Sequence, residues 1–140
     1  RQILRVFGPV RPFVNILASE ERHIQALSRL CQRYGIAIPD DDWEARVVLP
    51  ASLQEACEQG VAGEIENAAL YEDLLAATAP YPEVQNVFRN LQAASQYRHL
   101  PAFQRGVERY QDRGGRRGAR PLGRSPGGGR GRRRRGHCLT

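Results

Sequence analysis

The sequence predicts an all-α fold, an antiparallel helical bundle, and three observations favour it. Apolar residues recur at helical spacing along three long segments, which end near Tyr34, Ala77 and Tyr110. Glycine and proline stand at the segment boundaries, where helices end or begin. Short turns join most of the segments, and one longer link covers residues 35–51. At 140 residues the chain is long enough for one domain with a modest core.

The first element is a stub. Residues 1–7 resemble the last two turns of a helix that starts upstream, and Gly8-Pro9 ends it. The chain begins with Arg1 and contains no Met, so we expect a fragment or a processed product. The predicted bundle is therefore N-terminally truncated, with three full helices and a stub of the first.

The second helix should begin at Val10 or Pro12 and stop at Gly35. Its apolar stripe runs from Phe13 to Tyr34, but in the middle of the segment the stripe falls on Glu20 and His23. These residues lie one turn apart on the face where a core residue is expected. A buried carboxylate needs a cation, a hydrogen-bond network or water, so Glu20 and His23 are either metal ligands or part of a core polar network.

We expect residues 35–51 to form a loop, because Pro39, Pro50 and Asp40–Asp42 all disfavour a helix. The three Asp lack the alternating ligands of a calcium loop and read as a solvated turn, and Trp43 should pin the loop to the bundle. Ser52 and Glu55 form a capping box that starts a third helix, which should run to about Ala77. Gly60 and Gly63 weaken this helix locally and allow a close helix approach.

Pro82 suits the first position of a last helix, which should run to about Tyr110 with a kink at Pro101, just after His99. Further polar residues should face the core. Glu64 projects near the middle of the apolar face of the third helix, with Asn67 one turn on, whereas Glu66 points to the flank. On the last helix Ser95 and His99 lie near the centre of the inner face, and Gln96 stands three residues before His99.

These residues carry a family resemblance. The chain resembles the ferritin-like superfamily on the rubrerythrin side, and more closely the bacterial ferritin-like domains of unknown function (domain of unknown function family 2202). The matching stretches cover residues 1 to about 110: Ser19 to His23, Glu64 to Tyr71, Phe88 to Leu91 and Arg98 to Leu100. The resemblance implies a four-helix bundle with a metal centre of the di-iron type, whose ligands would be Glu20, His23, Glu64 and His99.

The sequence departs from the full ligand set. The first-helix Glu of such sites would lie upstream of Arg1, and Gln96 stands where the fourth-helix Glu is expected. We therefore predict at most one ion per chain, iron or else zinc or manganese, with Gln96, Ser95, Asn67 and Glu66 as supporting or substitute ligands. One divalent ion with Glu20, Glu64 and two neutral imidazoles has no net charge.

The net charge of +6 is divided unevenly along the chain. Residues 1–111 carry 11 Arg and 14 acids, whereas residues 112–140 carry 10 Arg and one Asp. We expect residues 1–111 to form the bundle domain and residues 112–140 to be a disordered Arg/Gly-rich tail. The tail can bind nucleic acid without sequence preference, or it can be a solubilising or incidental charge run. Its candidate contacts are Arg116, Arg117, Arg130, Arg132, Arg133, Arg134 and Arg135.

Two function hypotheses follow. The first is a ferritin-like metal-binding bundle with a degenerate di-iron or single-metal centre, related to oxygen, peroxide or iron handling. This hypothesis leaves open whether the protein is an enzyme. The second is a non-enzymatic bundle with a buried polar network and a nucleic-acid-binding tail. Three widely spaced Cys predict reduced thiols in the cytoplasm, with Cys31 and Cys57 in the core. No apolar run predicts a membrane span, and a homodimer could supply missing helix contacts.

Overall fold

The computed structural model describes residues 1–43 and 46–118, with side chains up to Gln111. All regular structure in these ranges is helical: α1 (Gln2–Phe7), α2 (Phe13–Arg33), α3 (Leu53–Ala77), α4 (Pro82–Ala94), the π-helix η2 (Ser95–His99) and α5 (Leu100–Gly118). The predicted all-α class is confirmed, as is the order of a short helix followed by three long helical segments. No helix in the described ranges has both the length and the apolar character needed to cross a membrane.

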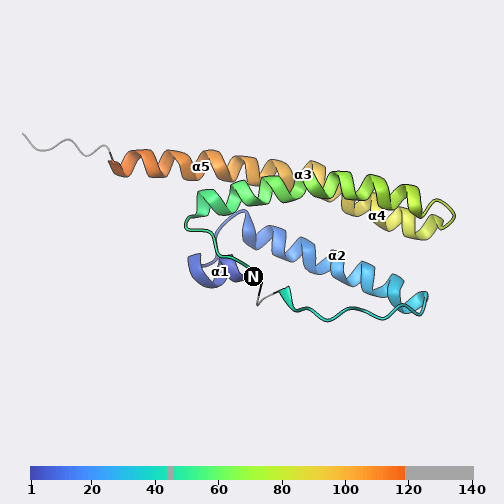
Figure 1. The fold of residues 1–140 in the computed structure, drawn as a ribbon. Helices are drawn as coiled ribbons and strands as arrows, with labels where there is room; N and C mark the ends of the chain where they lie inside the picture. The colour runs from blue at the N-terminus through green and yellow to red at the C-terminus, as the bar shows by residue number, and fades with distance from the viewer. Residues whose placement is uncertain (44–45, 119–140) are drawn as a thin grey trace, which may run out of the picture.

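Helix α3 packs against both α4 and α5, and α4 also contacts α2. Helix α3 lies along α4 and α5 and runs antiparallel to them, while α2 packs against α4 from the other side (Figure 1). The link between α2 and α3 runs back along α2, so α2 and α3 point in the same direction (Figure 1). This crossover places the middle of α2, the middle of α3 and the turn η2 around one interior region.

The helix boundaries follow the local chemistry. Gly8 ends α1 with φ 77° and Gly35 follows α2 with φ 65°, a left-handed conformation that glycine adopts without steric cost. The Ser52 hydroxyl accepts a hydrogen bond of 3.1 Å from the Glu55 amide, as the capping box predicts. The Glu55 carboxylate, however, accepts from the Ala51 amide at 2.7 Å, one residue before the expected partner.

Just before Pro101, where the sequence predicted a kink, the helix contains a π-turn. The Leu100 amide donates to the Ser95 carbonyl, five residues back, and Pro101 lies just beyond this wider turn. Proline has no amide hydrogen and its ring crowds the carbonyl four residues earlier, so a widened turn accommodates it. Helix α5 then continues to Gly118, so the predicted helix end near Tyr110 is wrong.

The contact between α3 and α5 depends on two glycines. A Cβ atom at Gly60 would lie 2.6 Å from the Phe103 ring, and one at Gly106 would lie 2.6 Å from the Cys57 sulfur. Cys57 and Phe103 are buried core residues. Gly60 therefore permits the close approach that the sequence predicted, whereas a Cβ atom at Gly63 would meet nothing within 4 Å.

The predicted contact of Trp43 with the bundle is wrong. Trp43 is 68% exposed and does not pin the link to the bundle, because the link runs outside α2. Ile65 is 57% exposed because the buried line of α3 passes through its neighbour, Glu64, which is 6% exposed. Of the predicted core cysteines, Cys57 is buried and Cys31 is half-buried.

Candidate metal centre

Helix α2 contributes two side chains of the Ser19–His23 stretch to the interior. Glu20 is half-buried, and its Oε2 lies 3.1 Å from Nδ1 of His23, one turn further along the helix. Because an ionised carboxylate only accepts hydrogen bonds, Nδ1 of His23 carries the proton in this contact. The other ring nitrogen of His23, Nε2, lies 3.4 Å from the hydroxyl of buried Ser19. The α2 pair is thus held in a fixed orientation.

Helix α3 contributes Glu64, a buried carboxylate whose two oxygens have different partners. Its Oε2 accepts hydrogen bonds from the Ser95 hydroxyl and, at 3.5 Å, from the Asn67 amide group. Its Oε1 lies 3.4 Å from Nδ1 of His99. Two neutral donors therefore satisfy one oxygen of Glu64, and the other oxygen faces the interior between the helices.

The π-turn contributes His99, which joins the two carboxylates. Its Nδ1 lies 3.0 Å from Oε1 of Glu20 and 3.4 Å from Oε1 of Glu64. The ring of His99 is buried, its centre lies 5.5 Å from that of His23, and its Nε2 has no hydrogen-bond partner among the described residues. One nitrogen thus lies between carboxylates from α2 and α3, which are distant in sequence.

The hydrogen bonds among Glu20, Glu64, His23 and His99 shift the pKa values of His99 and Glu20. Hydrogen bonds to Glu20 and then to Glu64 raise the pKa of His99 from 6.5 to about 9. Burial by itself raises the pKa of Glu20, but the hydrogen bonds from His99 and His23 outweigh it and leave this pKa below its ordinary value. At neutral pH a proton on Nδ1 of His99 therefore occupies the position between the carboxylates.

The same position suits a metal ion. Glu20, Glu64 and His99 each offer one ligand atom, and these atoms all lie within 4.8 Å of one another. Carboxylate oxygens together with an imidazole nitrogen are donors that zinc, iron and manganese accept. Ser95 and Asn67 on Glu64, and His23 on Glu20, hold the ligands in the way that outer partners do in metal sites.

The structure brings together the four residues that the sequence singled out as ligands, but with different roles. Glu20, Glu64 and His99 form the three-ligand group, whereas His23 contacts Glu20 and lies outside that group. Ser95 and Asn67 bind Glu64. Gln96 is half-buried and forms no hydrogen bond with Glu20, Glu64 or His99, and Glu66 is exposed on α3. The side chains of Arg116 and Arg117 and all of Arg130 and Arg132–Arg135 lie outside the described residues.

Sequence reasoning missed one neighbour of the cluster, Tyr71. Burial raises the pKa of its hydroxyl, and the negative charges of Glu20 and Glu64 raise it further. Its ring centre lies 6.3 Å from that of Phe88. Tyr71 follows Glu64 by two helical turns, so this spacing was the signal that could have placed it on the same face.

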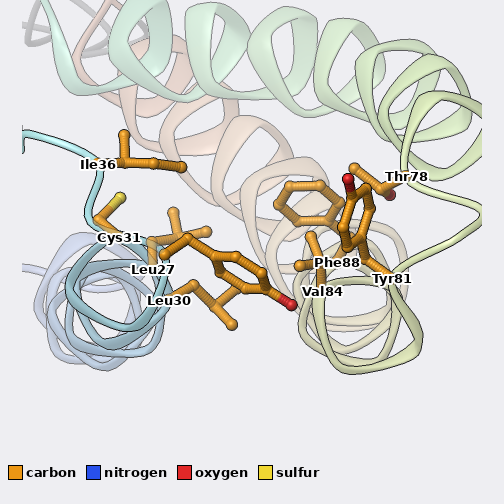
Figure 2. A pocket seen from close by; sticks show the side chains of 9 residues that line it. Leu27, Leu30, Cys31, Ile36, Thr78, Tyr81, Val84 and Phe88 are labelled. Carbon is orange, nitrogen blue, oxygen red and sulfur yellow. The ribbon is translucent and has the colours of Figure 1, made fainter.

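An apolar cavity of about 490 Å³ lies further along α2, toward its C-terminal end. Figure 2 shows side chains of α2 and its following link on one side and side chains of α4 and the preceding turn on the other. The lining residues are Leu27, Leu30, Cys31, Tyr34, Ile36, Thr78, Tyr81, Val84 and Phe88. Phe88 lines this cavity and its ring also lies beside that of Tyr71.

Residues 7–126 match the family described as "Uncharacterized protein domain (DUF2202)". The chain belongs to this family. No curated protein and no solved structure matches the chain. The DUF2202 match covers Glu20, Glu64 and His99, and it confirms the resemblance to domain of unknown function family 2202.

Proposed function

We propose that this DUF2202 chain is a metal-binding bundle protein of the ferritin-like, rubrerythrin type. In this proposal Glu20, Glu64 and His99 hold one divalent ion. The observation that carries it is the position of His99 Nδ1 within 3.0 and 3.4 Å of carboxylate oxygens from two other helices. The crossover between α2 and α3 and the inward Glu-x-x-His unit support the ferritin-like part.

Charge and geometry favour a single ion. Two carboxylates neutralise one divalent cation, whereas a second ion would leave two positive charges unneutralised in the interior. Gln96 and exposed Glu66 supply no further carboxylate to the cluster. Iron would supply redox chemistry toward oxygen or peroxide, and zinc would supply Lewis acidity. The chain's own residues position the ligands, with Ser95 and Asn67 fixing Glu64 and His23 fixing Glu20.

Metal loading of the full chain tests the proposal. After loading with iron or zinc and removal of free metal, elemental analysis should find one ion per chain. Glu64→Gln and His99→Asn should each weaken binding at least 100-fold, because each removes one of three protein ligands. Glu66→Gln is the matched control, since this carboxylate is exposed on the same helix. Two retained ions, or unchanged binding in the Glu64→Gln/His99→Asn double variant, would contradict the proposal.

A second candidate is a purely structural polar network. It is favoured by the hydrogen bonds of Glu20 and Glu64 with His99, His23, Ser95 and Asn67, which satisfy both carboxylates without an ion. In this case a chelator should leave the thermal unfolding midpoint unchanged and added zinc should not raise it. A zinc-dependent rise that His99→Asn abolishes would exclude this alternative.

We also propose self-association in the cytoplasm. The unpaired thiols of Cys31 and Cys57 support the location. Exposed apolar side chains on α2, the link and α3, among them Ile24, Val48 and Leu70, support a homodimer. Sedimentation velocity should show a concentration-dependent dimer that Val48→Asp weakens, while Arg29→Gln on the polar surface of α2 should not affect it.

A further inference from the structure

A polar groove of about 350 Å³ lies between α2 and the α4–η2 segment, beside the candidate metal centre. Its volume falls within the roughly 300–1,000 Å³ that small-molecule sites span. The lining residues are Ser19, Arg22, His23, Ala26, Asn90, Leu91, Ala93, Ala94 and Arg98. Two arginines and three further polar side chains, Ser19, His23 and Asn90, thus line a groove whose lining has no carboxylate.

The two helices contribute matching pairs to this region. Arg22 precedes His23 on α2, and Arg98 precedes His99 on η2. Each imidazole contacts Glu20, whereas the two arginines line the groove. The Ser19–His23 stretch is therefore shared: Glu20 serves the metal centre, and Ser19 and Arg22 serve the groove.

Neither guanidinium forms a hydrogen bond or ion pair with any described residue. The nearest acid in sequence to Arg22, Glu21, pairs with Arg1 at 3.3 Å. Both arginines are exposed, and their donors are available to a ligand. A guanidinium presents a planar set of donors that matches phosphate and carboxylate oxygens, and two of them neutralise a doubly charged group.

Ser19 and His23 complete the polar lining. Ser19 is buried and its hydroxyl lies 3.4 Å from Nε2 of His23, on the side of the ring away from Glu20. The carboxylate of Glu20 is itself occupied by His23 and His99. Because Nδ1 of His23 carries the ring proton, the Ser19 hydroxyl donates to Nε2 of His23. A bound anion therefore meets donors from Asn90 and both arginines, with the negative charge of Glu20 on the far side of the imidazole.

We propose that this groove binds a small oxyanion, a phosphate or carboxylate group, between Arg22 and Arg98. The site does not depend on the metal centre, because its arginines, Ser19 and Asn90 are not metal ligands. It is therefore tested on the metal-free full chain, and its failure would leave the metal proposal unaffected.

The probe is inorganic phosphate, titrated at constant ionic strength and followed through the ring nitrogens of His23 by NMR. Saturable shifts of these signals are expected, with affinity at least tenfold weaker in Arg22→Gln and in Arg98→Gln. Arg29→Gln on the same helix, outside the groove, is the control and should bind as the unaltered chain does. If Arg98→Gln loses helix content, Arg22→Gln within the long helix α2 decides the comparison.

A parallel titration with acetate distinguishes the two oxyanion classes. Saturation by acetate as well as phosphate assigns the groove to carboxylates and phosphates alike, and saturation by phosphate alone assigns it to phosphates. The Arg-rich tail can also attract anions, but that association should not respond to Arg22 or Arg98. Shifts that do not saturate with either anion, or that persist in the Arg22→Gln/Arg98→Gln double variant, would overturn the proposal.

Discussion

At the residue scale, His99 is the side chain that connects the carboxylates of Glu20 and Glu64. Its Nδ1 lies between two carboxylates while its Nε2 is buried without a partner among the described residues. An unpaired buried polar atom destabilises a fold unless another interaction offsets it. For His99 that interaction is the paired charge of Glu20 and Glu64, which the raised pKa reflects.

The pH dependence of stability follows from this pKa. Unfolded His99 releases its proton near pH 6.5, and folded His99 near pH 9. Its contribution is therefore complete below pH 6.5 and is lost as pH rises to 9. Glu20, with a lowered pKa, titrates below this window, and the thiol of Cys57, with a pKa of about 11, titrates above it.

We accordingly expect the free energy of unfolding of the metal-free chain to fall by a few kcal/mol between pH 6.5 and 9. Urea unfolding at several pH values measures this change. His99→Asn should flatten the dependence, because it removes the group that releases the proton. An equally steep fall in that variant would show that another group is responsible.

At the element scale, the π-turn aligns two halves of one long helix. The buried residues Leu91, Ser95, His99 and Phe103 recur every four positions. In an α-helix each such step drifts by about 40° around the axis, so three steps would turn Phe103 away from α3. The wider turn at Ser95–His99 contains more residues per turn and so offsets this rotation. Ser95, His99 and the Phe103–Gly60 contact therefore stay on one face of the helix.

The two glycines of α3 offer a matched pair of substitutions. Gly63→Ala meets nothing within 4 Å and should stabilise the chain by roughly 0.5–1 kcal/mol, as alanine does in a helix interior. Gly60→Ala places its methyl group 2.6 Å from the Phe103 ring and should destabilise the chain by about 1–3 kcal/mol. Thermal or urea unfolding of the two variants compares them. Equal effects at both positions would mean that α3 and α5 do not pack this closely.

At the scale of the whole molecule, the positive charge is concentrated in the C-terminal segment, outside the bundle. Residues 119–140 contain seven Arg and no acid, whereas residues 1–111 carry a net charge of −3, from 11 Arg and 14 acids. Helix α5 extends to Gly118, so it joins the bundle to this basic segment. A polyanion should therefore bind the segment while the acidic bundle does not attract it.

Truncation after Gly118 tests this separation without shortening α5. The full chain should bind duplex DNA weakly, and log affinity should fall with log salt concentration at roughly −0.9 per phosphate contact. The truncated chain should lose most of this affinity. Fluorescence anisotropy at several salt concentrations measures the DNA affinity of both chains. Equal affinity of the two chains would rule out a role for residues 119–140.

The sequence by itself determined the helices, their caps and the polar residues that replace core residues. Helical periodicity and the Ser52 cap are local features, so they identified α2 and α3 and placed Glu20, Glu64 and His99 on inner faces. Only the tertiary structure decided that His99 joins the two carboxylates while His23 supports Glu20. It also showed the π-turn before Pro101, which the sequence did not predict. These outcomes depend on how α2, α3 and η2 pack, and packing distances between segments distant in sequence are not encoded in the spacing of residues along one helix.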